Sequence, residues 1–345
     1  MQVIEGLENL KLPPIPRAVA VGAFDGFHLG HQYLLTQLCG IAWNRGLASS
    51  LLTFEPIPAE YFAGPDAPPK RLTTRDERIA LAAALCCDLM VILEFGDSLV
   101  QTSASDFCRE ILVGRLNVKL LMASVTHTLG HERAGLGQIR ELGRELGFEV
   151  VEAPGVQLGD LRVSSSEVRR LLAEGHVEEA MGLLGRRYHV SGEVVSGRGV
   201  GRHLGFPTTN LQVPRAKILP ADAVYAGLAI IERGPEALRD TVWPAAISIG
   251  TAPTYGLTER LVEAHLLTDE PLELLGCTIR LEFIRRVRWQ ERFASEAELQ
   301  AQIAHDVEEI RRLCRAGPAD VPAGPGRTCL APSFPGCAVL RAPEG

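Results

Sequence analysis

The chain has 345 residues, of which 46% are hydrophobic and 22% are charged, as in soluble globular proteins. This length exceeds that of an average single domain, so we expect two domains. The formal net charge of -7 at pH 7 argues against a nucleic-acid-binding protein, and the sequence offers no run of about 18 apolar residues that could cross a membrane.

The eight cysteines are scattered along the chain and form no CxxC pair. Cys86 and Cys87 are adjacent, which suits neither an ordinary disulfide nor a zinc site. Segment 1–14 lacks the basic and apolar regions of a signal peptide. We therefore expect a soluble protein in the reducing cytoplasm.

Between residues 17 and 153, short apolar runs alternate with amphipathic stretches of helical periodicity. This alternation predicts an α/β domain, in which helices cover both faces of a parallel sheet. Gly46 and Gly147 follow two of the helical stretches, where helices commonly end. The expected strands are 17–22, 47–54, 88–95, 118–124 and 148–153, and the expected helices are 31–45, 75–85, 104–116, 136–146, 165–173 and 176–184.

After residue 186 the sequence changes to β-rich segments separated by glycine and proline. With no regular helix expected between these segments, the pattern favours an antiparallel sheet or small barrel. A final helix is predicted at 295–314, with Ser295 as N-cap and Glu298 completing a capping box. The strands are expected at 188–197, 223–231, 245–250, 260–267 and 277–287, and the domains at 1–186 and 187–315, followed by a proline-rich, disordered tail at 316–345.

Segment 22–32, GAFDGFHLGHQ, directly follows the first of these expected strands. A strand, a glycine-rich turn and a helix N-terminus together form a common phosphate-binding arrangement in α/β proteins. His28 and His31 are three residues apart, so both can project to one side and donate hydrogen bonds to a triphosphate. Spacing alone equally allows two histidines that cap or pack the helix, or that hold a metal.

HLGH after a strand resembles the signature of the nucleotidyltransferase superfamily that carries HxGH. Together with TFEP at 53–56, RLTT at 71–74 and the serine-rich segment 163–186, it resembles the FMN adenylyltransferase module of bacterial bifunctional riboflavin kinase/FAD synthetases. The resemblance implies a Rossmann-like nucleotidyltransferase domain in which His28 and His31 are catalytic. It also implies that ATP and its phosphates are bound by Gly22, Phe24, Asp25, Gly30, Ser164, Ser165, Ser166 and Arg169. For the serines and Arg169, the residues alone favour an N-capped, basic surface helix.

Two stretches depart from this module. Ile57 follows TFEP where the family usually has histidine. The family's G-x-D-F-x-F-G motif, on the flavin side of its site, aligns with SVTHTLG at 124–130. Its acid then falls on Thr126 and its two aromatics on His127 and Leu129, so we expect a carboxylate contact and ring-stacking area to be lost.

Segment 196–211, SGRGVGRHLGFPTTNL, is rich in glycine and locally basic. Glycines allow the close backbone approach that a phosphate-binding loop needs, but such loops are also common in β-hairpins. No G-K-[ST] follows, so the segment is not a Walker A loop. It resembles the G-x-x-x-G-R-x-L-G-F-P-T-x-N signature of riboflavin kinases. The resemblance implies a β-barrel kinase domain whose matching phosphate-binding residues are Gly197, Gly199, Gly201, Arg202, Gly205 and Pro207.

In the same resemblance, Thr208 and Asn210 match the residues that coordinate the magnesium of MgATP, and Glu263 in LVEAHLL matches the base that takes the proton of the ribityl hydroxyl. Successive side chains of a strand point to opposite faces, so Glu263 faces the other side from Val262 and Ala264. Without the resemblance, Thr208 and Asn210 are turn residues after Pro207, and Glu263 is an outward-facing strand carboxylate. Ser248 stands where the family has asparagine, and we expect this change to leave the phosphate and base positions untouched.

The favoured interpretation is an enzyme of FAD biosynthesis that phosphorylates riboflavin to FMN with MgATP and then adenylylates FMN to FAD with release of pyrophosphate. The expected partners are therefore the small molecules riboflavin, FMN and ATP, with Mg²⁺, and neither nucleic acid nor membrane. One alternative is a riboflavin kinase with a degenerate N-terminal domain, and another is an N-terminal nucleotidyltransferase with a different acceptor. A third, a non-catalytic flavin-binding or scaffold protein, conflicts with the retention of Thr208, Asn210 and Glu263.

Overall fold

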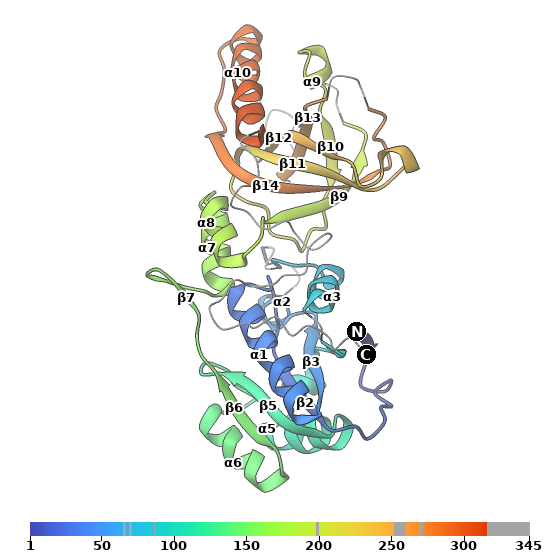
Figure 1. Cartoon of the computed structure of the whole chain (residues 1–345). Coiled ribbons are helices and arrows are strands. Elements are labelled where there is room, and N and C mark those ends of the chain that lie inside the picture. Colours follow the sequence, from blue (N-terminus) through green and yellow to red (C-terminus); the bar gives the residue numbers. More distant parts are fainter. Residues whose placement is uncertain are drawn as a thin grey trace.

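The computed structural model describes residues 1–64, 67–68, 71–85, 87–197, 200–251, 260–268 and 272–315. An α/β domain and a β-barrel lie at opposite ends of the molecule, with a pair of short helices between them (Figure 1). The expected order of a parallel sheet, an antiparallel barrel and a terminal helix is confirmed. The tail expected at 316–345 lies outside the described residues.

The first domain is built on a six-stranded sheet of order β1-β4-β3-β2-β5-β6, in which every pairing is parallel. Alternate residues of the central strand face opposite layers, as the two-residue period of a strand requires. Ala18 and Ala20 pack with α1 and α3, whereas Val19 and Val21 pack with η1 and α6. Helices therefore cover both faces of the sheet.

The elements of the first domain follow the predicted alternation closely. Gly46 and Gly147 end α1 and α6 in the left-handed conformation, with φ of 64° and 80°, as expected. The elements are β1 (Gln2–Glu5), β2 (Arg17–Val21), α1 (Leu29–Arg45), β3 (Ala48–Glu55), α2 (Pro58–Ala63), α3 (Arg75–Ala84), β4 (Leu89–Glu94), α4 (Asp97–Val100), α5 (Ala104–Asp106), the π-helix η1 (Phe107–Arg115), β5 (Val118–Ser124), α6 (Leu136–Leu146), β6 (Glu149–Ala153), β7 (Gln157–Leu158), β8 (Leu161–Arg162), α7 (Ser165–Ala173) and α8 (Val177–Leu184).

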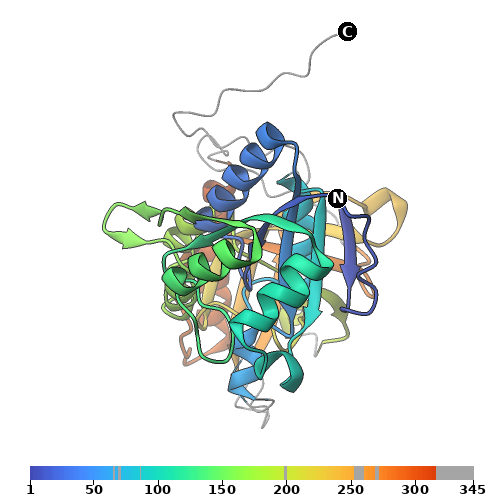
Figure 2. The same ribbon diagram turned by 90° about the horizontal axis from the view of Figure 1, so that it is seen from below.

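Several features of this domain were not expected, among them the short helices α2 and α4. Strand β1 was missed because it has only four residues, of which Ile4 alone is buried, and it pairs with the distant strand β4. The helix expected at 104–116 is one turn of α-helix followed by the wider π-helix η1. The short hairpin β7–β8 (green) projects from one side of the molecule in both views (Figure 1 and Figure 2).

The second domain is a closed barrel of order β10-β13-β12-β11-β14-β9 with antiparallel pairings throughout. No long helix interrupts the described strands, although two single-turn helices, α9 and η2, lie between them. They are too short to carry the apolar periodicity that sequence reasoning detects. The elements are β9 (His189–Val195), α9 (Val200–His203), β10 (Thr209–Gln212), β11 (Ala223–Arg233), η2 (Glu236–Leu238), β12 (Val242–Thr251), β13 (Arg260–Leu266), β14 (Thr278–Trp289) and α10 (Glu296–Arg315).

The terminal helix α10 begins as predicted. The Ser295 hydroxyl accepts a hydrogen bond from the Glu298 amide at 3.3 Å, and the Glu298 carboxylate accepts one in return from the Ala294 amide at 3.1 Å. Ser295 therefore caps the helix as predicted, but the return bond to Glu298 comes from the amide of Ala294, whereas a capping box uses the amide of Ser295. Across the described ranges, no helix combines the length and apolarity needed to span a bilayer.

A buried polar cluster joins the two domains. The Glu77 carboxylate of α3 accepts from Lys217 Nζ at 2.5 Å and lies 3.2 Å from His189 Nε2 of the barrel. Nearby, Arg71 and Lys217 form an isolated parallel β-bridge. The barrel is therefore attached to the segment that follows β3 in the first domain.

Candidate active sites

The first site lies where β2 ends and α1 begins, and the loop between them is tightly wound. Phe24, Gly26 and Phe27 all have positive φ, of 47°, 82° and 41°. For residues with a side chain this conformation costs about 1–2 kcal/mol each, so it persists only where neighbouring groups hold it. The fully buried ring of Phe27 is part of what anchors the loop.

His28 and His31 lie together, as their spacing predicted. Their rings stack with centroids 3.7 Å apart, and the ring of Phe24 contacts that of His31 at 5.0 Å. His28 is also the N-cap of α1, because its Nδ1 accepts from the His31 amide at 3.3 Å. A side chain on Gly30 would touch the His28 ring at 3.1 Å, so glycine there allows the ring to lie over the helix start.

Both imidazoles are held in the neutral state. Burial, reinforced by the positive charge of Arg186, lowers the pKa of His28 to about 4. Burial and the neighbouring His28 and Arg186 lower the pKa of His31 well below its usual value. A neutral imidazole can still donate one N–H to a phosphate oxygen.

The resemblance implied that Asp25 helps to bind ATP, and in the structure its carboxylate is bonded to other parts of the protein. Its carboxylate is buried and accepts from the amides of Leu72 and Thr73 at 3.0 and 2.9 Å and from Arg169 Nη2 at 2.5 Å. Asp25 therefore links the loop between β2 and α1 to the RLTT segment and to α7. This arrangement explains why RLTT and the arginine accompany HLGH in the sequence.

The serine-rich turn and α7 meet the start of α1. Ser164 caps α7 by accepting from the Glu167 amide at 3.2 Å, and Ser165 Oγ donates to the Asp25 carbonyl at 2.7 Å. Ser166 is exposed. The N-termini of α1 and α7 therefore lie close together. Each helix N-terminus carries partial positive charge and amide donors that can bind a phosphate. The capped-helix alternative describes Ser164 correctly and is compatible with a phosphate site.

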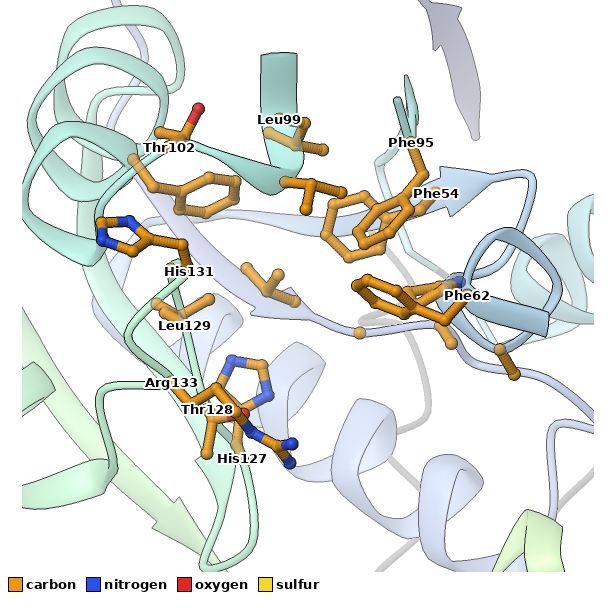
Figure 3. A pocket seen from close by; sticks show the side chains of 18 of the residues that line it. Phe54, Phe62, Phe95, Leu99, Thr102, His127, Thr128, Leu129, His131 and Arg133 are labelled. Carbon is orange, nitrogen blue, oxygen red and sulfur yellow. The ribbon is translucent and has the colours of Figure 1, made fainter. Parts of the chain in front are cut away.

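A cavity of about 800 Å³ opens beside this loop, and Gly22 and Ala23 form part of its wall. Figure 3 shows Phe54, Phe62 and Phe95 on one side and His127, His131 and Arg133 on the other. Phe62 is 69% exposed, so its ring is available to a ligand. Planar aromatic surfaces of this kind suit a flat heteroaromatic ring.

The divergent segment 124–130 lies in the wall of this cavity. Thr126, His127 and Leu129 occupy the positions where the sequence comparison predicted a loss of stacking area and of an acid. The three phenylalanines come instead from β3, α2 and the residue after β4. The cavity thus retains aromatic walls although its motif has diverged.

Arg133 is presented by a firmly anchored loop. Leu129 and Ala134 exchange backbone hydrogen bonds at 3.0 and 2.8 Å, which closes the loop. Glu132 ties it to α5 by accepting from the Ala104 amide at 2.9 Å. Arg133 itself has φ of 56°, and of the described residues lining the cavity it alone carries a permanent charge.

The second site lies on the outer face of the barrel where β10 meets β13. Leu211 and Val262 are paired and buried in the barrel, so Asn210 and its partner Glu263 face outward. Thr208, two residues before Asn210, lies with Glu263 in the wall of a cavity of about 320 Å³. The alternation expected for Glu263 is confirmed. Asn210 lies on strand β10, so the alternative of a turn residue is wrong for it, whereas Thr208 directly precedes the strand.

Two glycines are needed for this arrangement because other atoms occupy the space of a side chain. A Cβ on Gly197 would lie 1.9 Å from Asn210 Nδ2, and one on Gly201 would lie 2.4 Å from the Phe206 carbonyl oxygen and 3.1 Å from Thr208 Oγ1. Gly205 has φ of 82°. Gly199 and the side chain of Arg202, also expected here, lie outside the described residues. Pro207 is exposed, and its carbonyl bonds to His265 Nδ1 at 2.7 Å.

The cavity beside Glu263 is closed by groups that the sequence did not indicate. Leu299, Ile303 and Val307 of α10 form an apolar wall opposite the barrel. Ser248 lies in the cavity wall and is the cross-strand partner of Glu263 on β12. The expectation that the change at Ser248 is remote from the base position is therefore wrong, because only strand pairing reveals this neighbour.

The described residues hold no group of three or more histidine, cysteine or acidic side chains that could bind a metal alone. The oxygens of Thr208 and Asn210 nevertheless fit Mg²⁺, which typically takes one or two protein ligands and completes its shell with water and phosphate oxygens. Thr208 is exposed at the cavity, so a nucleotide-bound ion can reach it.

Comparison with known proteins matches both halves of the chain. The family model described as FAD synthetase matches residues 13–167, and the model described as riboflavin kinase matches residues 184–314. The bifunctional riboflavin kinase/FMN adenylyltransferase of Escherichia coli K12 is 35% identical over 308 residues, covering 89% of this chain and 96% of its own. The enzyme of the same name from Buchnera aphidicola subsp. Schizaphis graminum is 32% identical over 316 residues, covering 90% and 98%.

One solved structure has the same arrangement over nearly its whole length. It is described as a macrolide-efflux protein from Streptococcus pneumoniae and superposes with a TM-score of 0.79 at 26% identity, covering 90% of this chain and 99% of its own. Both domains are therefore shared, together with their order.

Proposed function

This chain belongs to the bifunctional riboflavin kinase/FMN adenylyltransferase family, and we propose from that premise how its residues divide the two steps of FAD biosynthesis. Riboflavin is phosphorylated to FMN at the barrel, and FMN is adenylylated to FAD at the α/β domain. The observation that carries this division is the presence of two separate cavities, one beside Glu263 and one beside the histidine loop. We take 1–186 and 187–315 as the boundaries of the two domains.

In the kinase step, the apolar wall of α10 and the outer face of β12 and β13 hold the riboflavin ring and direct its 5′-hydroxyl toward Glu263. The Glu263 carboxylate accepts the hydroxyl proton while the oxygen attacks the γ-phosphorus of ATP and ADP leaves. Amides of the glycine loop from Gly197 to Gly205 bind the phosphates. A Mg²⁺ ion on Thr208 and Asn210 would neutralise charge on the transferred phosphoryl group.

In the adenylyl transfer step, an oxygen of the FMN phosphate attacks the α-phosphorus of ATP, and pyrophosphate leaves. The phosphates lie at the joined N-termini of α1 and α7, where the amides, Ser166 and Arg169 bind negative charge. The neutral rings of His28 and His31 donate hydrogen bonds to the α-phosphate as its charge develops.

The 800 Å³ cavity supplies the acceptor site for this step. Its phenylalanine side takes the isoalloxazine ring, in place of the aromatic residues missing at 127 and 129. Arg133 on the opposite side binds the FMN phosphate, because a guanidinium pairs well with a phosphate. Riboflavin lacks that phosphate, so the cavity prefers the product of the barrel over its substrate. None of the five cysteines in the described ranges forms a disulfide, in keeping with the reducing, cytoplasmic setting that we propose.

The test is a product analysis of the purified full-length protein with riboflavin, ATP and Mg²⁺, followed by chromatographic separation of flavins. We expect both FMN and FAD. The variant Glu263→Gln should lose FMN formation by about a hundredfold or more but still convert added FMN to FAD. FMN without FAD would favour a kinase with an inactive or differently specific first domain, and full kinase activity in Glu263→Gln would refute the assignment of the base.

A further inference from the structure

The residue at the junction of the two domains reaches into the loop that carries the histidines. Arg186 follows the last turn of α8 and is only 3% exposed. Its Nη2 donates to the carbonyl of Gly26 at 2.7 Å, and its Nη1 donates to the carbonyl of Phe27 at 3.1 Å. One guanidinium therefore binds two consecutive carbonyls immediately before His28.

We propose that Arg186 is a positioning residue for adenylyl transfer: it holds the Gly26–Phe27 backbone in its wound form and thereby places His28 and His31 at the phosphate site. This inference rests on the proposed assignment of FMN adenylyl transfer to the first domain. Arg186 acts through the loop and touches neither histidine by a hydrogen bond in the described structure.

The conformation of the loop explains why such a residue is needed. Gly26 and Phe27 both have positive φ and lie between β2 and α1, so their carbonyls belong to neither element. Buried carbonyls without a partner are costly, and a charged donor satisfies them more strongly than a neutral one. Removing the guanidinium would leave the buried Gly26 carbonyl without this partner and the Phe27 carbonyl with Gln32 alone, and the loop would relax toward conformations with negative φ.

Neighbouring contacts make the junction and the loop one packed unit. Gln32 of α1 donates through Nε2 to the carbonyls of Phe27 and Leu184, at 2.7 and 2.8 Å. Arg186 also reaches the Leu184 carbonyl at 3.4 Å. A side chain on Gly185 would lie 2.6 Å from the Leu29 side chain at the start of α1, so the end of α8 packs directly on that helix.

The charge of Arg186 has a second consequence for the same histidines. Its positive charge adds to burial in lowering the pKa of both His28 and His31. The carboxylate of Asp25 is the nearest described acid on the loop and is already paired with Arg169. The negative charges of Glu77 and Asp25 also act on the guanidinium, and the two rings stay neutral beside it.

The experiment compares Arg186→Met and Arg186→Lys with wild type in the full-length protein, measuring both activities on each preparation. Arg187→Met is the matched control, because Arg187 pairs with Glu282 of β14 at 3.3 Å and has no described hydrogen bond or ion pair with residues 24–28. The wild type must first form FAD from added FMN. If it does not, the proposed function fails independently of Arg186.

For Arg186→Met we expect kcat of adenylyl transfer to fall at least about tenfold, with KM for FMN changed less than about threefold and the kinase rate unchanged. Arg186→Lys should recover part of kcat, since an ammonium keeps the charge but lacks the planar fork of donors that binds both carbonyls. Arg187→Met should retain the wild-type adenylyl transfer rate. Unchanged kcat in Arg186→Met, an equal loss of both activities, or an equal loss in Arg187→Met would overturn the proposal.

Discussion

At the scale of single residues, several side chains in the first domain serve the structure and the site together. His28 caps α1 through Nδ1 while its ring stacks on His31, so its position is determined by the helix as well as by any ligand. The buried Asp25 carboxylate connects three segments of chain. Substituting either residue will therefore change stability and activity together, and the two effects must be measured separately.

The buried state of His28 predicts how stability depends on pH. Its pKa is about 4 in the folded protein and 6.5 when exposed, so the unfolded chain binds more protons between these values. The free energy of unfolding should thus fall as the pH falls from 6.5 to 4, by roughly 3 kcal/mol at most from this group. Urea unfolding at several pH values should show a shallower decline in His28→Gln.

The control for this measurement is His305→Gln on α10, where the side chain is exposed. It should keep the wild-type slope. If His28→Gln also keeps the wild-type slope, the neutral state assigned to His28 in the folded protein is incorrect.

Arg133 allows a test of substrate preference at the first site. Replacing it with glutamine removes the permanent charge but keeps a polar side chain. A charge-assisted hydrogen bond contributes about 1.5–3 kcal/mol, so KM for FMN in adenylyl transfer should rise about tenfold or more. The kinase constants for riboflavin should not change. Steady-state kinetics of both steps provide the measurement.

Arg140→Gln serves as the matched control, because Arg140 lies on α6 and pairs only with exposed Glu152 at 2.9 Å among the described residues. An unchanged KM for FMN in Arg133→Gln would exclude Arg133 as the phosphate-binding residue.

At the scale of elements, the glycine loop and strand β10 form one structural unit. Gly201 approaches the Phe206 carbonyl and Thr208 so closely that an alanine Cβ would collide with backbone 2.4 Å away. Because a backbone oxygen cannot swing aside as a side chain can, Gly201→Ala should displace Thr208. We expect a loss of kinase activity of at least about tenfold, with adenylyl transfer of added FMN retained.

Gly40→Ala is the control for this substitution, since a Cβ at Gly40 meets nothing within 4 Å and lies in the exposed part of α1. It should preserve both activities and slightly stabilise the helix, because alanine has the higher helix propensity. Wild-type kinase activity in Gly201→Ala would show that the close approach is not needed for catalysis.

At the scale of the whole molecule, the two domains are joined through buried charge. The Lys217 side chain is 1% exposed and bonds to Glu77 at 2.5 Å. Burial raises the pKa of Glu77, but the positive charge of Lys217 and the hydrogen bond with His189 lower it by more, so the carboxylate stays ionised. This pair crosses the junction and ties RLTT, and hence Asp25, to the barrel.

Glu77→Gln should destabilise the protein by about 3–5 kcal/mol, because it leaves the buried Lys217 without an opposite charge. Urea unfolding monitored by circular dichroism measures the change. The comparison is Glu152→Gln, which removes an exposed ion pair with Arg140 and should cost less than about 1 kcal/mol. Equal effects of the two substitutions would show that the junction pair contributes nothing special to stability.

Much of this architecture could be predicted from the sequence because the information is local. Apolar periodicity identified five of the six parallel strands and the principal helices, and Gly46, Gly147 and Ser295 marked their ends. The motifs around His28 and Thr208 were also visible, since each occupies a short continuous stretch. Short elements such as β1 and α9 were missed because four residues carry too little periodic signal.

The sequence by itself therefore determined the order of the two domains and the chemistry available at each site. The tertiary structure decided which distant residues share a cavity. Phenylalanines from three elements replace the aromatics missing from 124–130, Ser248 faces Glu263, and Arg186 reaches Gly26 across 160 positions of sequence. Periodicity cannot encode such contacts, because they arise from the pairing of strands and the packing of helices after the chain has folded.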